Sequence, residues 1–184
     1  MEIYALRHGI TDLNKKGIPN GQIDEPLAPE GLEQAKQATS LVPPNTKIIY
    51  VSPLLRARQT AEAVNLGRNL PISINDSIKE LNMGSLAGNS WDTLEGGQGL
   101  RKLHQTLEFD YRPYGGESAA DFRNRILGFL EQIRYKHSTK SVLLVTHGVI
   151  IRMLTLLEQG KPLEKTENLS LHTFNLDRIF GVTG

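Results

Sequence analysis

The sequence contains no cysteine, no long apolar run and no excess of either charge. The absence of cysteine among the 184 residues excludes disulfides and thiolate metal sites. No stretch approaches the ~20 apolar residues of a membrane-spanning helix. The first predicted strand begins almost at Met1, which leaves no room for a signal peptide. These absences predict a cytoplasmic protein.

The balance of charge also restricts the partners of the chain. The net charge is +1, and no block of like charges stands out. A weak, dispersed charge argues against a general nucleic-acid or membrane surface. Hydrophobic residues make up 39% and charged residues 22% of the chain, as expected for a globular protein. We therefore predict one domain over residues 1–184, with a small molecule as partner and a homodimer left open.

Short apolar runs alternate with segments of helical periodicity. The predicted strands are 3–6, 47–51, 71–74, 141–146 and 169–175. One predicted helix runs from Pro29 to the Pro43-Pro44 pair, and another from Val149 to Gln159. Two more are predicted from their starts: one after a Ser52 N-cap with Pro53 at its first position, and one after a Ser118–Asp121 capping box. Alternating strands and helices predict an α/β three-layer sandwich with a mostly parallel sheet and one antiparallel edge strand, formed by residues 169–175.

The residues at or after the strand ends suit phosphate chemistry. They are Arg7 and His8 after the first strand, Arg56 after the second, Glu80 after the third and His147 after the fourth. Ligands of open α/β sheets bind at this edge. Arginine can bind two phosphate oxygens with its planar guanidinium group. A neutral imidazole can attack phosphorus, and a protonated imidazole can stabilise the transferring group. A carboxylic acid can protonate a leaving alkoxide.

Simpler interpretations compete with this one. An Arg-His-Gly segment at a strand end is by itself usually a solvated loop, so the prediction depends on the repetition at several strands. A metal site is not expected, because His8 and His147 lie far apart in sequence and no His-Glu-x-x-His spacing is present. No cofactor is expected either.

Taken in order, these motifs resemble those of the histidine phosphatase superfamily, which has the phosphoglycerate mutase-like fold. The matching segments extend from residue 3 to about 176, and the ordered set is far more specific than any one motif. They are Arg7-His8-Gly9-Ile10-Thr11 through Asn14, Ser52-Pro53-Leu54-Leu55-Arg56-Ala57-Arg58-Gln59-Thr60-Ala61, Glu80 through Gly84, Gly115-Gly116-Glu117-Ser118, and Thr146-His147-Gly148 with Arg152.

The resemblance implies a phosphorylated intermediate on His8, with Glu80 and His147 as further catalytic residues. It also implies phosphate ligands at Arg7, Arg56, Asn14 and Gly148. Asn14 has a simpler interpretation as a turn residue, which asparagine favours.

The chain departs from the family pattern in two places. Ile18-Pro19-Asn20-Gly21 stands where many members have Arg-x-Gln-Gly, so one residue that could contact phosphate or substrate is missing. Ala28 replaces the usual threonine cap. Residues 83–117 form a lid-like excursion, similar to that of small phosphatases such as the α-ribazole phosphatase group.

We therefore expect a metal-independent phosphatase acting on a small phosphorylated metabolite. The alternatives are a phosphoglycerate mutase and an inactive phosphate-binding relative. The substrate cannot be read from the sequence, and contacts to it from Glu117, Trp91, Tyr111 and Tyr114 are left open. His104, His137 and His172 are expected to be surface or structural residues.

Overall fold

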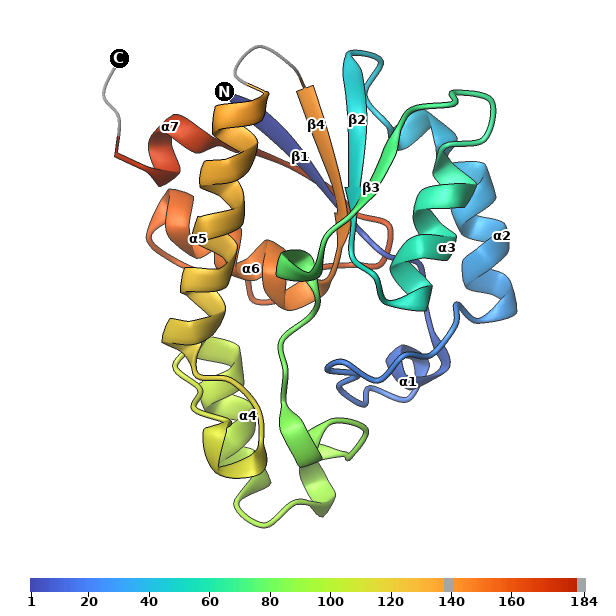
Figure 1. The fold of residues 1–184 in the computed structure, drawn as a ribbon. Coiled ribbons are helices and arrows are strands. Elements are labelled where there is room, and N and C mark those ends of the chain that lie inside the picture. The colour runs from blue at the N-terminus through green and yellow to red at the C-terminus, as the bar shows by residue number, and fades with distance from the viewer. Residues whose placement is uncertain (138–140, 182–184) are drawn as a thin grey trace.

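The computed structural model describes residues 1–137 and 141–181, which form a five-stranded sheet between two layers of helices (Figure 1). The strand order is β3-β2-β4-β1-β5, and only β5 is antiparallel to its neighbour. The strands are β1 (Glu2–Arg7), β2 (Thr46–Val51), β3 (Ile72–Ile74), β4 (Ser141–Thr146) and β5 (Leu171–Asn175). This confirms the predicted fold, including the antiparallel edge strand.

Helices cover both faces of the sheet, with α2 and α3 on one face and α5, α6 and α7 on the other (Figure 1). The helices are α1 (Asp12–Lys15), α2 (Pro29–Gln37), α3 (Leu55–Val64), α4 (Gly97–Thr106), α5 (Ala119–Lys136), α6 (Gly148–Gln159) and α7 (Leu176–Ile179). Short 3₁₀ turns are η1 (Ala38–Leu41), η2 (Asp76–Ile78), η3 (Gly84–Leu86), η4 (Trp91–Thr93) and η5 (Arg112–Tyr114).

Alternating side chains of the central strands pack into two hydrophobic cores, one on each face of the sheet. On β4, Leu143 and Val145 pack in the cluster that contains Ala57 of α3. Val142 and Leu144 of the same strand point the other way, into the cluster of α5 and α6. Because successive strand residues face opposite sides, a strand buried on both faces must be apolar throughout, as this one is.

The parallel register of β1 and β4 places the two predicted catalytic histidines next to each other. Arg7 pairs with Thr146, so His8 and His147 both follow directly after the last paired residues. The ring centroids of the two histidines are 5.1 Å apart. It is the pairing of these strands in the sheet that brings two residues so distant in sequence together.

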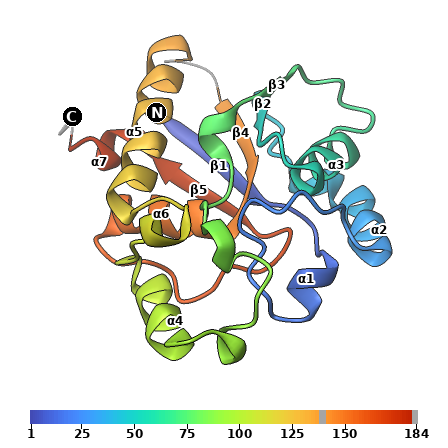
Figure 2. The same ribbon diagram turned by 60° about the horizontal axis from the view of Figure 1, so that its bottom comes forward.

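The excursion over residues 83–117 lies beyond the carboxyl ends of the parallel strands (Figure 2). It carries α4 and three of the 3₁₀ turns, and with α1 it flanks the end of the sheet where the candidate site lies. That residues 1–184 form a single domain with this excursion stays a prediction. The last residues of the chain, 182–184, lie outside the part that the structure describes.

One predicted helix start was wrong. Ser52 was expected to be the N-cap and Pro53 the first helical residue, but α3 begins at Leu55 with Leu54 as its N-cap. The Ser52 hydroxyl accepts a hydrogen bond from the Leu54 N–H at 3.3 Å and contacts His147 instead. The Ser118–Asp121 capping box of α5 is confirmed.

Within the described residues, no helix is both long and apolar enough to cross a membrane.

Candidate active site

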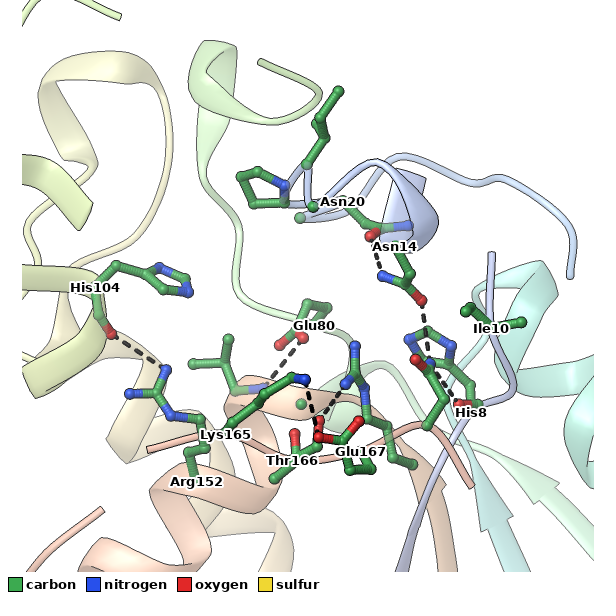
Figure 3. A pocket seen from close by; sticks show the side chains of 18 of the residues that line it. His8, Ile10, Asn14, Asn20, Glu80, His104, Arg152, Lys165, Thr166 and Glu167 are labelled. Carbon is green, nitrogen blue, oxygen red and sulfur yellow. Dashed lines mark hydrogen bonds and ion pairs between the residues drawn. The ribbon is translucent and has the colours of Figure 1, made fainter. Parts of the chain in front are cut away.

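A cleft of about 420 Å³ opens at the carboxyl ends of β1 and β4 (Figure 3). Most of the residues predicted from the sequence line it: Arg7, His8, Asn14, Arg56, Glu80 and Gly148. The exception is His147, which is fully buried behind the surface of the cleft, beside His8.

The hydrogen bonds of His8 determine which of its nitrogens carries the proton. Its Nδ1 lies 2.7 Å from the carbonyl oxygen of Gly9, which can only accept. Its Nε2 lies 3.2 Å from Nε of Arg56, which can only donate. His8 is therefore protonated on Nδ1 and carries a lone pair on Nε2. Burial, with the nearby Arg56 and Arg7 charges, holds the pKa of His8 well below 6.5, so the ring stays neutral.

Arg56 is held at the start of α3 by backbone carbonyls. It is fully buried and donates to Ile23 O at 2.6 Å and Gly21 O at 2.9 Å. These two carbonyl oxygens therefore fix its guanidinium plane against His8. Burial lowers the pKa of Arg56, but a guanidinium remains protonated in proteins and keeps its positive charge.

Arg7 supplies a second fixed cation. Its Nη1 donates to the carbonyl oxygen of Thr166, while its buried Nε has no hydrogen-bond partner among the described residues. A Cβ added at Gly148 would lie 3.4 Å from that Nε and 3.0 Å from Thr166 Oγ1, so a larger residue there would crowd the arginine. Gly148 is also the first residue of α6, where free N–H groups favour an anion.

His147 is oriented by Ser52, a role the sequence did not reveal. Its Nε2 lies 2.7 Å from Ser52 Oγ, and its buried Nδ1 has no partner in the described part of the chain. Ser52 is fully buried, and among the described residues its hydroxyl hydrogen has no acceptor other than Nε2 of His147, so donation to Nε2 satisfies it and leaves the His147 proton on Nδ1.

The sequence suggested a protonated second histidine, but the free protein favours the neutral form of His147. Burial is the main cause that holds the pKa of His147 well below 6.5, and the Arg56 charge acts in the same direction. The ring is therefore neutral before an anion arrives, although its Nδ1–H remains a donor.

Glu80 is a partly buried carboxyl group at the centre of the cleft (Figure 3). Burial raises its pKa above 4.5, and this outweighs the opposing effects of hydrogen bonds from the Leu81 and Val149 N–H groups and of the Arg56 and Arg7 charges. Those two N–H groups bind separate oxygens, at 2.9 and 3.2 Å, and fix the carboxyl plane. A raised pKa makes a proton available for transfer at a higher pH.

An asparagine network holds the loop that follows β1. Asn14 accepts from the Thr11 N–H as part of the α1 capping box and donates to Asn20 Oδ1 at 2.8 Å. Asn168 donates to Asn14 Oδ1 at 3.1 Å and to His8 O at 3.0 Å. Asn14 thus has the structural role of a turn residue and also lines the cleft; contact with phosphate stays a prediction. Asn168 and Asn20 were not identified from sequence, since asparagine is common in loops.

Glu117 does not reach the cleft. Its carboxylate binds Arg125 at 2.7 Å and accepts from the Asn82 N–H at 2.8 Å, so it fastens the excursion to α5. Tyr114 is partly exposed and does not line the cleft, and Tyr111 is fully buried. Trp91 does line the cleft.

His104 was expected to be a surface or structural residue, but it lines the cleft. It lies across from His8 in Figure 3, on the last turn of α4. Its Nδ1 is 3.1 Å from the Tyr111 hydroxyl. No sequence signal marked it, because only the path of the excursion brings it to the site. His172 packs on β5 and His137 contacts the Tyr50 hydroxyl, as structural residues do.

The described residues contain no group of three or more histidine, cysteine or acidic side chains placed to hold a metal ion. Metal-independence itself stays a prediction, because it concerns activity.

The structure is that of an α/β protein with a cleft lined by arginine, histidine and acidic side chains at the ends of parallel strands. The family model described as "Histidine phosphatase superfamily (branch 1)" matches residues 3–179. The chain belongs to that family, as its motifs indicated.

Relatives named for two activities resemble the chain over nearly its whole length. A Hydrogenobacter thermophilus protein named "Putative phosphoserine phosphatase 2" is 27% identical over 96% of this chain and 88% of its own. One from Escherichia coli O1:K1 named "Probable phosphoglycerate mutase GpmB" is 31% identical over 97% and 84%. The crystal structure of a phosphoglycerate mutase from Thermus thermophilus is 29% identical, covers 94% and 92%, and superposes with a TM-score of 0.78.

Proposed function

We propose that this protein is a metal-independent phosphatase that hydrolyses a small phosphomonoester through a phosphohistidine on His8. The observation that carries the proposal is the state of His8. The Gly9 hydrogen bond holds the proton on Nδ1, so Nε2 carries the lone pair, and the charges of Arg56 and Arg7 act on the ring. A neutral, oriented imidazole next to a phosphate-binding fork is what nucleophilic attack on phosphorus requires.

In the first step, Nε2 of His8 forms a bond to phosphorus as the ester P–O bond breaks. The leaving oxygen takes its proton from Glu80, whose raised pKa favours the protonated form. Arg56 exchanges its 3.2 Å bond to Nε2 for a phosphoryl oxygen, and Arg7 offers its free Nε. We assign Asn14 and the Gly148 N–H as further phosphate ligands and His147 Nδ1–H as a donor to the transferring group.

In the second step, water attacks phosphorus and the N–P bond breaks. Glu80, now a carboxylate, accepts the proton from water, and inorganic phosphate leaves. Glu80 is thereby returned to its acid form, and His8 regains the lone pair on Nε2.

A phosphoglycerate mutase is the second candidate, because two of the relatives carry that name. A mutase must keep the phosphoryl group on the histidine until the substrate rebinds by its other oxygen. The excursion over residues 83–117 contributes one α-helix of ten residues and short turns, which favours access of water. We therefore place hydrolysis first.

The products distinguish the two activities. With 3-phosphoglycerate, or with any other accepted ester, we expect inorganic phosphate as the main product. Phosphate release and ³¹P spectra of the same reaction measure both outcomes. Dominant conversion to 2-phosphoglycerate would instead establish the mutase.

Activity is expected to survive a chelator. The proposed steps use only side chains of this chain, so dialysis against EDTA should leave the hydrolysis rate within about twofold, as for a phosphoryl transfer stabilised by arginines rather than Mg²⁺. Loss of activity on chelation, with recovery on adding Mg²⁺ or Zn²⁺, would contradict the proposed site.

We also propose that the protein is cytoplasmic and that its partner is a small phosphorylated metabolite. Whether it forms a homodimer is left open.

A further inference from the structure

His104 presents a polar nitrogen to the end of the cleft opposite His8. In Figure 3 its ring points into the cleft, with Glu80 between the two histidines in that view. The ring packs against Trp91 at 5.4 Å between centroids, so its orientation is fixed by the excursion. The proposed leaving oxygen lies at Glu80, so His104 faces the rest of the leaving group.

The Tyr111 hydroxyl determines the tautomer of His104. Tyr111 is fully buried, and the only hydrogen-bond partner of its hydroxyl among the described residues is Nδ1 of His104, at 3.1 Å. A buried hydroxyl that did not donate would leave its hydrogen unsatisfied. Tyr111 therefore donates to Nδ1, and the proton of His104 resides on Nε2, the nitrogen left for the cleft. Burial lowers the pKa of His104 to about 4, so the ring is neutral at physiological pH.

A buried cation, Arg152, contacts the backbone of His104 and lines the same cleft. Arg152 donates to the carbonyl oxygens of His104 and Gln105, at the carboxyl end of α4, and to Leu163 O at 2.9 Å. It therefore caps that helix and fixes a positive charge at this wall of the cleft. Besides Glu80, the carboxylates that line the cleft are Glu164 and Glu167, and Glu167 is paired with Lys165 at 2.9 Å.

We propose that His104 is a specificity residue whose Nε2–H binds a carboxylate on the leaving group of the substrate. A neutral N–H donor backed by a cation fits an anionic acceptor, and the substrate class is then a phosphomonoester of a small carboxylic acid. This inference rests on the proposed function for one point, that the phosphoryl group binds at His8.

Binding of stable phosphonates tests the inference without any turnover. The probes are 2-amino-4-phosphonobutanoate and 3-aminopropylphosphonate, which differ only in the carboxylate. Calorimetry on the wild-type protein should show tighter binding of the carboxylated probe, on the order of 10- to 100-fold, as expected for one charge-assisted hydrogen bond. Hydrolysis assays test the proposed function separately, so the two can fail independently.

Two substitutions of similar size separate the donor from the packing of the ring. His104→Asn can reach Tyr111 but is too short to present a donor where Nε2 lies, and it should remove most of the preference. His104→Gln places an amide N–H near the position of Nε2 and should keep most of it. His172→Asn, on β5 and away from the cleft, is the matched control and should bind as the wild type does.

Equal binding of both probes by the wild type, or no binding of either, would overturn the inference. A preference that survives His104→Asn would also overturn it, because another group would then hold the carboxylate. Melting temperatures of the variants establish that each is folded before binding is compared.

Discussion

Replacing His8 by asparagine is expected to abolish turnover and to remove a covalent phosphate that the wild-type protein carries. When ³²P-labelled substrate is quenched rapidly with base, the wild type should retain label that is stable to base and lost in acid, as an N–P bond is. Loss of the nucleophile of a covalent mechanism costs on the order of 10⁴-fold or more. His8→Asn should therefore show neither label nor significant phosphate release.

Asparagine is chosen because it retains one of the two contacts of His8. Its amide can donate to the Gly9 carbonyl as Nδ1 does, while nothing replaces Nε2. The parallel substitution His147→Asn, directly after the neighbouring strand β4, is the matched comparison: it should slow labelling, and the label should still be on His8. Label that persists in His8→Asn and vanishes in His147→Asn would assign the nucleophile to His147. A wild-type protein that turns over and is never labelled would exclude a phosphohistidine altogether.

Replacing Glu80 by glutamine is expected to slow the reaction in a way that depends on the leaving group. An alkoxide leaves with a proton, whereas a nitrophenolate is stable without one. General acid catalysis contributes ~10²–10⁴-fold where it is needed. Phosphorylation of His8 should therefore slow by that factor with an alkyl phosphate and far less with p-nitrophenyl phosphate. The comparison uses the burst phase, since hydrolysis of the phosphohistidine is common to both substrates.

The pH dependence gives a second measure of the same role. Glu80 acts while protonated, so kcat/KM for the alkyl ester should fall as pH rises through its raised pKa, and Glu80→Gln should remove that fall. The nitrophenyl ester should show little of it. Arg56→Ala is the contrasting variant: it should harm both esters alike, because both present the same phosphoryl oxygens to Arg56.

Equal losses with both esters would show that Glu80 is not the acid. The candidates would then be Glu164 and Glu167 on the rim of the cleft. Glu117, which the sequence left open, is excluded from that role by its engagement with Arg125 and Asn82. The melting temperature of Glu80→Gln is the necessary control, because glutamine has one acceptor oxygen for the two N–H groups that bind Glu80.

Local chemistry explains why the sequence predicted the fold and much of the site. An apolar run such as Val142–Val145 can only be satisfied by burial on both faces, which requires a central strand between helical layers. Residues directly after such strands must then gather at one edge of the sheet. Arg7, His8, Glu80 and Arg56 could be identified for that reason, and their order matched a known family.

The tertiary structure decided what depends on contacts between distant segments. The tautomer of His8 follows from Arg56, 48 residues away in sequence, and the orientation of His147 follows from Ser52, 95 residues away. Ser52 satisfies the local rule for a helix cap by its place before Pro53, yet its hydroxyl contacts His147.

The excursion over residues 83–117 shows most clearly the difference between what the sequence predicts and what only the folded chain decides. Residues 83–117 have no strong periodicity, so their sequence did not predict which side chains face the cleft. Packing placed His104 against Trp91 and Tyr111 at the site and turned Glu117 away to Arg125. The sequence by itself determined the sheet, the order of the motifs and the residue types that gather at the edge of the sheet, because these follow from periodicity and residue type. Only the tertiary structure decided the tautomers, the orientation of the side chains and which residues of the excursion line the cleft, because burial and hydrogen-bond partners exist only once the chain is folded.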